Sequence, residues 1–457
     1  MMAALSLGQI AKVTGGELLG DDCPVSSLST DSRKIDSGSA YLALSGERFD
    51  GHDFVVEAAA RGATSAIVSK PVRVDLPRVQ VKNSLLALGQ IAAINREAFS
   101  GPVVALTGSC GKTSCKEMLA AILRRSKAVL ATDGNLNNEI GVPLTLLGIG
   151  VDHDIAIIEM GAAKRGDIAY LCQFAKPDIA LITNAAPAHL EGFGSLQAVA
   201  DTKGEIYQSL RQDGTAVINA DDRFADQWRK STAAQRVLSV SRFNSESDFF
   251  ASDIRITERG TAFQLHAPGE VAEVTLSVLG VAMVSNALLA AAAAWAAGAG
   301  MREIVEGLAS VKAVKGRLHL QSFPQLNLVD DSYNANPASV AAAIDVLASF
   351  KGRRVLVLGD MAELGGETEQ LHSEVGAYAA QQGIDRVLTC GALSQFTARA
   401  AGAIARHFPD KNALISDLNA ELQAGDSVLV KGSRSAGMEV VVKAIANTQV
   451  TGGNAPC

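Results

Sequence analysis

The sequence predicts an α/β protein of three domains: a small α+β module, a central P-loop-type and mostly parallel sheet, and a C-terminal Rossmann-like α/β domain. The chain has 457 residues, of which 48% are hydrophobic and 19% are charged, which is enough for about three domains with large cores. Apolar segments alternate with helical patterns between residues 84 and 313, and the alternation returns between residues 314 and 457. This alternation indicates parallel strands covered by helices.

The individual elements follow in chain order. Residues 1–83 mix short apolar runs with turn signals and end in the strand-like RVQVKN, which predicts the small α+β module. Four apolar segments then end in glycine, proline or Asx turns: GPVVALTG, DIAIIEMGA, DIALITNAA and GTAVINADD. Between about 237 and 280 shorter segments alternate in polarity, which predicts an antiparallel ribbon added to the central sheet. The last series contains LNLVDDSYNANP, RRVLVLGDMAELGG, IDRVLTCG and DSVLVKGSRSAGMEVVV.

One alanine-rich segment is as long as a membrane span. It runs from Val281 to Gly300 and is almost uncharged. It contains Ser285 and Asn286, however, and no basic flank or aromatic belt frames it. We therefore predict a buried helix and no membrane span.

Charge and cysteine usage narrow the class of protein. The formal net charge is −7 and no lysine or arginine block is present, so we predict no nucleic-acid partner. The six cysteines form no C-x-x-C pair, and the N-terminus has no pattern of an export signal. We expect reduced thiols in a cytoplasmic protein. We also expect a monomer.

The stretch VVALTGSCGKTSCKEM predicts a phosphate-binding loop between a strand and a helix. Gly108 and Gly111 would leave backbone N–H groups for phosphate oxygens, Lys112 would add a positive charge, and Thr113 would offer a hydroxyl to magnesium. The spacing is G-x-x-G-K-T, because Leu106 stands where the longer motif has its first glycine. A glycine turn at a helix start is the alternative, and the preceding strand and the Lys-Thr pair make it less favourable.

Polar residues that follow the other strands are candidate ligands, because open parallel sheets bind ligands beyond the carboxyl ends of their strands. Glu159 ends one apolar segment, and His189 follows the next one, close to Glu191. Taken singly, each is typical of a solvated loop. The asparagines of GNLNNEIGVP are typical of an Asx-turn loop.

Taken together, these motifs resemble the Mur ligase family. The resemblance covers nearly the whole chain and rests on a set of short motifs: STDSR, FDGHDF, TGSCGKTSCKEM, GNLNNEIGVPLTLL, IIEMGA, TNAAPAHLEGFGS, KGEI, INADD, KGRL, DDSYNANP, GDMAELG and VKGSRSAGME. The shortened phosphate loop is this family's own form. Two motifs, DDSYNANP and GDMAELG, resemble the members that add a dipeptide, whereas the D-N-P-[RA] signature of the members that add the third residue is not seen.

The resemblance implies an ATP-dependent amide synthesis in peptidoglycan formation. A carboxylate of UDP-N-acetylmuramoyl-tripeptide would attack the γ-phosphate, and the amine of D-alanyl-D-alanine would attack the resulting acyl phosphate. The family pattern leaves open whether the third peptide residue is diaminopimelate or lysine. Two alternatives stay open as well. One is a folylpolyglutamate synthetase, which would not need the first module, and the other is a nucleotide-binding scaffold without ligase activity.

The resemblance also implies roles for individual residues. ATP would contact Gly108, Ser109, Cys110, Gly111, Lys112, Thr113, Ser114, Asn286, Arg317, Asp331 and Asn334. The two other substrates would contact Thr30, Asp31, Ser32, Arg33, Arg48, Asp50, His52, Asn135, Asn138, Lys431, Ser433 and Arg434. Two magnesium ions would bind at Thr113, Glu159, His189 and Lys203, and Lys112, His189 and Lys203 would be catalytic.

Lys203 and the segment before the alanine-rich helix do not fit the family pattern in a simple way. A cation does not ligate magnesium, so the resemblance requires Lys203 to be carbamylated, and a phosphate-contacting or surface lysine is the alternative. Relatives commonly show G-x-H-N-x-x-N-A before the alanine-rich helix, whereas Ala282 and Met283 occupy the His-Asn positions here. Any polar contact expected at those two positions is therefore in doubt, while Asn286 is retained.

Overall fold

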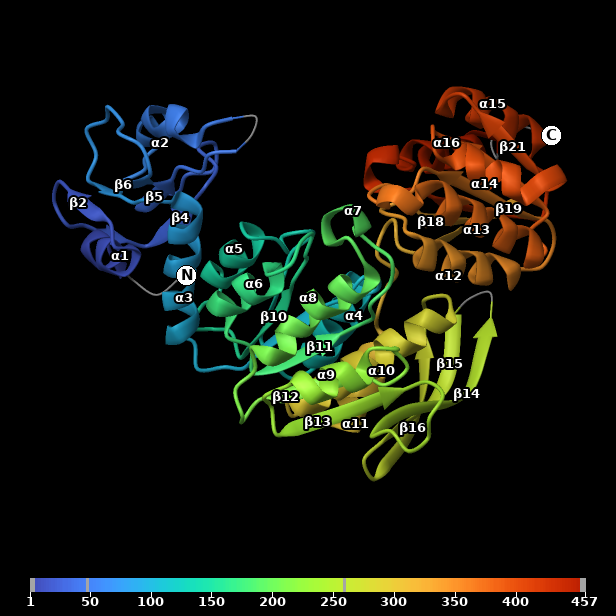
Figure 1. Ribbon diagram of the computed structural model, residues 1–457, viewed down its shortest axis with the longest axis horizontal. Helices are drawn as coiled ribbons and strands as arrows, with labels where there is room; N and C mark the ends of the chain where they lie inside the picture. The colour runs from blue at the N-terminus through green and yellow to red at the C-terminus, as the bar shows by residue number, and fades with distance from the viewer. Residues whose placement is uncertain (1–4, 47–48, 258–259, 453–457) are drawn as a thin grey trace.

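Three β-sheets, each packed against helices, organise the chain (Figure 1). The computed structural model describes residues 5–46, 49–257 and 260–452. The blue, green-to-yellow and orange-to-red parts of Figure 1 each contain one large sheet. The predicted three-domain α/β fold is therefore confirmed.

The first part is built on a five-stranded sheet of order β2-β7-β6-β5-β4, with β1 and β3 paired separately. Strands β4 to β7 are parallel and β2 is antiparallel to β7. The carboxyl ends of β4, β5 and β6 therefore share one edge. The elements are β1 (Leu5–Ser6), α1 (Leu7–Thr14), β2 (Glu17–Leu19), β3 (Pro24–Val25), β4 (Ser27–Ser29), β5 (Ser39–Leu42), η1 (Gly51–Phe54), α2 (Val55–Ala60), β6 (Ser65–Val68) and β7 (Arg78–Gln80).

Helix α3 (Ser84–Ala98) joins the first part to the central part. Asn83 caps the helix by accepting a hydrogen bond from the Leu86 N–H at 3.0 Å. The fully buried Leu88 and Ile91 belong to one apolar cluster that extends from Ile10 in α1 into the central sheet. In Figure 1 this blue helix lies beside the green α5 and α6, which it contacts. The core of the first part is thus continuous with the central core.

The central sheet has nine strands in the order β16-β15-β14-β13-β12-β11-β8-β10-β9. All neighbouring pairs from β9 to β14 are parallel, whereas β14, β15 and β16 are antiparallel. The predicted ribbon is therefore confirmed. The strands are β8 (Val103–Thr107), β9 (Val129–Ala131), β10 (Ile155–Glu159), β11 (Ile179–Ile182), β12 (Thr215–Asn219), β13 (Arg236–Ser241), β14 (Phe249–Thr257), β15 (Gly260–Ala267) and β16 (Glu270–Leu276).

Helices cover both faces of the central sheet because the strand side chains alternate between two apolar clusters. One face carries α4 (Lys112–Leu123), α10 (Val281–Ala296) and α11 (Met301–Ala309). The other face carries α5 (Gly141–Leu147), α6 (Asp167–Ala175), α8 (Leu196–Gln208) and α9 (Ala225–Ser231), and the short α7 (Leu190–Phe193) contacts α8. Residues 286–294 of α10 are all buried, which confirms the predicted buried helix. Within the described residues, no helix is long and apolar enough to cross a membrane.

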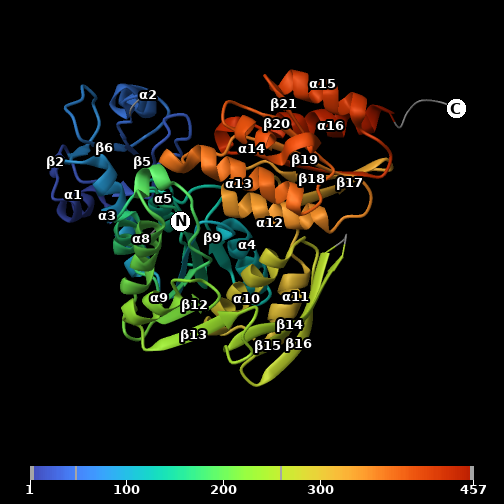
Figure 2. The same cartoon turned by 45° about the vertical axis from the view of Figure 1, so that its right-hand side comes forward.

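The last sheet has the order β17-β18-β22-β19-β20-β21, and only the β17–β18 pair is antiparallel. Its strands are β17 (His319–Ser322), β18 (Leu326–Asp331), β19 (Arg354–Gly359), β20 (Arg386–Cys390), β21 (Ala405–Phe408) and β22 (Asp426–Lys431). Its helices are α12 (Pro337–Ala348), η2 (Gly365–Glu367), α13 (Thr368–Gln381), α14 (Ser394–Ala401), η3 (Gly402–Ile404), α15 (Lys411–Glu421), η4 (Arg434–Ala436) and α16 (Glu439–Gly452). In Figure 2, α12 and α13 lie on the side that faces the central part.

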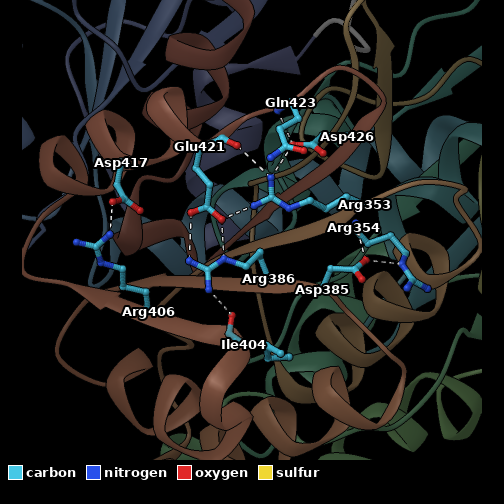
Figure 3. A network of polar contacts seen from close by, with 10 residues as sticks. All are labelled: Arg353, Arg354, Asp385, Arg386, Ile404, Arg406, Asp417, Glu421, Gln423 and Asp426. Atoms are coloured by element: carbon cyan, nitrogen blue, oxygen red, sulfur yellow. Dashed lines mark hydrogen bonds and ion pairs between the residues drawn. The ribbon is translucent and has the colours of Figure 1, made fainter.

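A charged network ties the amino ends of this last sheet together (Figure 3). Glu421, at the end of α15, accepts hydrogen bonds from Arg386 Nε at 2.6 Å and Nη2 at 3.2 Å, and pairs with Arg353. Arg353 also reaches Asp426 Oδ2 at 3.3 Å. Since ligands bind beyond the opposite, carboxyl ends of parallel strands, this network stabilises the sheet and leaves the ligand edge free.

Candidate active site

The phosphate loop, Gly108 to Gly111, connects β8 to the start of α4. Gly108 has φ 152°, and a Cβ there would lie 1.8 Å from Thr183 Oγ1. Gly111 has φ 80°, and a Cβ there would lie 2.6 Å from Asn286 Oδ1. Both positions therefore require glycine, because a side chain would collide with Thr183, just after β11, or with Asn286 of α10.

Asn184, which the sequence analysis did not single out, holds this loop. Its carbonyl accepts the N–H of Ser109 at 2.9 Å, and its Oδ1 accepts the N–H of Cys110 at 3.0 Å. Its Nδ2 donates to the Cys110 carbonyl at 3.1 Å. Those two N–H groups are thus used within the protein. The N–H groups of the first turn of α4 remain for an anion, because the first turn of a helix has no i−4 acceptors.

Two cavities adjoin at the phosphate loop. The smaller cavity, of about 490 Å³, is lined by most of the predicted ATP residues: Ser109, Cys110, Gly111, Ser114, Asn286, Arg317, Asp331 and Asn334, together with Lys431. The larger cavity, of about 980 Å³, is lined by Gly108, Lys112, Thr113, Asn135, Asn138, Glu159, His189 and Lys203. Arg317 and Asn334 line both, so the cavities meet between the central and last parts.

Glu159 ends β10 and is only 2% exposed. Asn137 Nδ2 donates to its Oε1 at 2.8 Å, and its own backbone N–H donates to Thr132 Oγ1 at 2.9 Å. Its other carboxylate oxygen, Oε2, is buried and has no hydrogen-bond partner among the described residues. A buried carboxylate oxygen without a partner is costly, and a bound cation or a water molecule would satisfy it.

Burial lowers the pKa of two of the lysines that line the larger cavity, Lys112 and Lys203. Lys112 donates from Nζ to the Gly108 carbonyl at 2.6 Å, and burial lowers its pKa. Lys203, on α8, is 3% exposed. Burial, with the nearby charge of Lys112 as a smaller cause, lowers the pKa of Lys203 to about 7. A substantial fraction of the Lys203 amine is therefore uncharged at neutral pH.

His189 precedes α7 and has a left-handed backbone, with φ 54°. Burial lowers its pKa, and the carboxylate of Glu363, from the last part, opposes that effect. The Nδ1 atom of His189 pairs with Glu363. The second nitrogen of the ring is left for another partner, since His189 also lines the larger cavity.

The metal-ligand atoms in the larger cavity suit a magnesium ion that is also bound by phosphate and water. They do not form a site in which the protein supplies every ligand. Among the described residues, no group of three or more His, Cys, Asp and Glu side chains could hold a metal. Magnesium commonly binds one or two carboxylates and completes its shell with phosphate oxygens and water. The Thr113 hydroxyl and the unpartnered Glu159 Oε2 are donors of this kind.

The last part contributes residues to both cavities. Lys431 is 2% exposed and donates to Asp331 Oδ2 at 2.5 Å and to the Asn334 carbonyl at 2.9 Å. The Arg317 guanidinium lies 4.3 Å from the centre of the Tyr333 ring, which lines the larger cavity. Ser433 and Arg434 line neither cavity, although Arg434 lies 5.9 Å from the same ring centre.

The candidate residues of the first part line neither cavity. Thr30, Asp31, Ser32 and Arg33 follow β4, and Asp50 and His52 lie in and beside η1, beyond β5. Arg33 donates to both carboxylate oxygens of Asp31, at 2.8 and 2.9 Å, and this lowers the pKa of Asp31 to about 2. Asp50 accepts from His52 and pairs with Lys70, which follows β6. Arg48 lies outside the described residues.

The smaller cavity contains polar residues that the sequence analysis left without a role. Asn219, the last residue of β12, and Asp221, which follows the strand in the quoted INADD motif, line it together with Arg242. Arg242 Nε is buried and has no hydrogen-bond partner among the described residues. Ala282 and Met283, the two positions that depart from the expected His-Asn pattern, line the same cavity.

Comparisons with known proteins cover almost the whole chain. Three family models match in order: the Mur ligase family catalytic domain at residues 24–96, the Mur ligase middle domain at 106–294, and the Mur ligase glutamate ligase domain at 316–434. The UDP-N-acetylmuramoyl-tripeptide–D-alanyl-D-alanine ligase of Escherichia coli K12 is 47% identical over 97% of this chain and 99% of its own.

Two solved structures are similar to this chain over more than nine tenths of its length. A crystal structure of MurF from Acinetobacter baumannii has a TM-score of 0.92 and 34% identity, and covers 98% of this chain and 99% of its own. The MurF ligase of Thermotoga maritima in complex with ADP has a TM-score of 0.85 and 30% identity, and covers 93% and 98%.

Proposed function

Because this chain belongs to the Mur ligase family, we propose that it uses ATP to join D-alanyl-D-alanine to UDP-N-acetylmuramoyl-tripeptide. The product is the UDP-linked pentapeptide precursor of peptidoglycan. The observation that carries the proposal is the larger cavity, which brings together Lys112, Thr113, Glu159, His189 and Lys203 from four separate segments.

The reaction has two steps. A tripeptide carboxylate oxygen attacks the γ-phosphorus of ATP; the new O–P bond forms as the bond to the bridging oxygen breaks, and ADP leaves. The amine of D-alanyl-D-alanine then attacks the acyl carbon, the C–N bond forms, phosphate leaves, and the amine loses a proton. Since the first step brings two anions together, it requires strong charge compensation, and Lys112 supplies part of it.

One cavity suits the adenosine of ATP, and the other suits the groups that react. The smaller cavity takes the adenosine of ATP, and its lining by Ser109, Asn286, Arg317 and Asp331 supports that role. The larger cavity takes the γ-phosphate and the peptide end of the tripeptide. Its position on the other side of the same loop supports this division, because the γ-phosphate must face the attacking carboxylate.

Magnesium fits the donors described above. Thr113 and Glu159 would hold one ion, and His189 and a carbamylated Lys203 would hold the second. The ions supply positive charge to the phosphate and carboxylate oxygens. The pKa of Lys203, about 7, supports carbamylation, because an uncharged amine can attack carbon dioxide and release a proton to solvent.

The UDP end of the tripeptide is proposed to bind at the shared edge of β4, β5 and β6, where Asp31, Arg33, Asp50 and His52 lie. Lys431, Ser433 and Arg434 would contact the incoming dipeptide. We propose domain boundaries after residues 83 and 313. We also propose that the protein is a monomer in the cytoplasm.

Phosphate release tests the function directly. The protein is mixed with ATP, magnesium, UDP-N-acetylmuramoyl-tripeptide and D-alanyl-D-alanine, and each substrate is omitted in turn. We expect phosphate release to require all three substrates, a product with the mass of the UDP-linked pentapeptide, and loss of both signals in Lys112→Ala. Phosphate release without a peptide product, or with a folate and glutamate in place of the wall precursors, would overturn the proposal.

A further inference from the structure

The loop that carries His189 docks onto the last part of the chain. The N–H of Glu191 donates to the Glu363 carbonyl at 3.4 Å, and Leu190 packs against the apolar cluster of the last part. A Cβ on Gly365 would lie 3.6 Å from the Glu191 backbone. In Figure 1, α7 lies at the edge of the central part that faces the orange part. The contact therefore joins backbone, apolar and charged groups of two domains.

The two side chains that pair in this contact, His189 and Glu363, belong to residues with an unusual backbone conformation. His189 has φ 54° and Glu363 has φ 63°, so both non-glycine residues are in the left-handed region. Such conformations persist only where the surrounding structure enforces them, and they cluster at functional and switching sites. The surrounding structure thus holds both His189 and Glu363 in the backbone conformations that allow them to pair.

An exposed ion pair contributes little to stability by itself. The side chains of His189 and Glu363 are 39% and 57% exposed, and pairs of this kind are screened by solvent. The chemistry of histidine as a metal ligand explains the pairing of His189 with Glu363 better than a contribution to stability does. A metal-binding histidine usually donates its other ring N–H to a carboxylate, which fixes the tautomer and the orientation of the ring.

We propose that Glu363 is a positioning residue for the second magnesium site, and that docking of the last domain completes this site. The Glu363 carboxylate accepts the Nδ1–H of His189, so the Nε2 lone pair is available to the ion. This inference rests on the proposed function. Because Glu363 and His189 belong to different domains, an undocked last domain leaves the ring free to rotate and to change tautomer.

The consequence is an order of events. The carboxylate and the γ-phosphate receive their full charge compensation only after the last domain has docked. Acyl phosphate formation is then restricted to a state in which the incoming dipeptide, bound by the same domain, is close. A reactive acyl phosphate is thereby kept from water.

Manganese binding tests the proposal without turnover. The probe is Mn²⁺, followed by electron paramagnetic resonance in the full-length protein with a non-hydrolysable ATP analogue and the UDP-tripeptide. The variants are Glu363→Ala, Glu363→Gln and, as the matched control, Glu369→Ala, an exposed glutamate in the first turn of α13. We expect Glu363→Ala to bind the second Mn²⁺ about 10- to 100-fold more weakly, with the first ion and the control unchanged.

The glutamine variant separates positioning from a simple ion pair. Its amide oxygen can accept the same Nδ1–H, so we expect Glu363→Gln to recover most of the second-site affinity. Equal loss in the glutamine and alanine variants would overturn the inference, because it would mean that the negative charge, rather than the acceptor, is needed. Two unaltered sites in Glu363→Ala would overturn it as well.

A second readout is the histidine tautomer. Nitrogen-15 spectra of labelled protein should show a proton on Nδ1 of His189 in the wild type, and a mixture of tautomers in Glu363→Ala. An unchanged Nδ1–H signal in that variant would refute the positioning role. Failure of the proposed function itself is recognised separately, by absent D-alanyl-D-alanine-dependent phosphate release in a wild-type protein whose tautomer and Mn²⁺ sites behave as expected.

Discussion

Asn137 Nδ2 donates to Glu159 Oε1 at 2.8 Å and leaves Oε2 as the only carboxylate oxygen of Glu159 without a partner. The amide therefore fixes which oxygen of Glu159 would face a bound magnesium ion. We expect Asn137→Ala to raise the magnesium concentration needed for half-maximal phosphate release about 10-fold. The matched control is Asp133→Ala, an exposed residue of the same loop. An unchanged magnesium requirement would exclude this positioning role.

The first part of the chain should affect only one substrate. We expect Asp31→Ala or Arg33→Ala to raise the KM for UDP-tripeptide about 10-fold or more, since a charge-assisted contact contributes about 1.5–3 kcal/mol. The KM for ATP should stay within about 2-fold, because neither residue lines the smaller cavity. Asp75→Ala, an exposed aspartate of the same part, is the control. Equal changes in both KM values would contradict the division of substrates.

Lys203 can act as a carbamate or as a cation, and the two roles predict opposite rescues. If the residue is carbamylated, Lys203→Ala should be nearly inactive, acetate should restore part of its activity, and Lys203→Arg should stay inactive. If it acts as a cation, arginine should retain activity and small amines should help the alanine variant. We expect the carbamate pattern. Rescue by amines without rescue by acetate would reject it.

The pH dependence of Lys203 follows from the direction of its pKa shift. Burial lowers its pKa to about 7, so the uncharged amine that reacts with carbon dioxide dominates above pH 7 and is depleted below it. After removal of carbon dioxide and its return, we expect activity to recover about 10-fold less at pH 6 than at pH 8, as measured by initial phosphate release. Equal recovery at both pH values would argue against a carbamate.

Cys110 is the cysteine whose alkylation should inactivate the protein. It is partly exposed, lines the smaller cavity and lies 3.2 Å from Asn336 Nδ2, whereas Cys115 is fully buried and burial raises its pKa. We expect iodoacetamide to inactivate the protein, and ATP with magnesium at 100 times its Kd to slow inactivation about 100-fold. Cys110→Ser should resist the reagent. Inactivation of that variant would identify another cysteine.

The Glu421 network should affect stability but not catalysis. Its partners are less than a third exposed, and we expect Glu421→Gln to destabilise the fold by about 1–2 kcal/mol, seen in chemical denaturation. Arg386 and Arg353 lower the pKa of Glu421, so its contribution is present above the ordinary glutamate pKa of about 4.5 and is lost as pH falls through the lowered value. The variant should therefore differ from the wild type at pH 7 and converge with it in acid. A constant difference across this range would contradict the assignment.

Much of the fold and several site residues could be predicted from the sequence, because they depend on residues that are close together in the chain. Apolar segments such as Ile155–Glu159 form strands whose periodicity needs no distant partner, and the alternating polarity after residue 237 predicted the antiparallel ribbon. The glycines at 108 and 111 were readable for a similar reason, since the spacing of the loop demands them. Glu159 and His189 were readable as polar residues that follow strands, the family resemblance added Lys203, and all three line the larger cavity.

Other features required the tertiary structure, because they depend on which distant side chains meet. The run GNLNNEIGVP offers three asparagines, and only packing against β10 selects Asn137 to hold Glu159, while Asn138 accepts backbone N–H groups at the start of α5. The pairing of His189 with Glu363 joins residues of different domains and depends on their docking. Local composition determines what each segment can form, whereas the close packing of whole domains decides which polar groups are left without a partner.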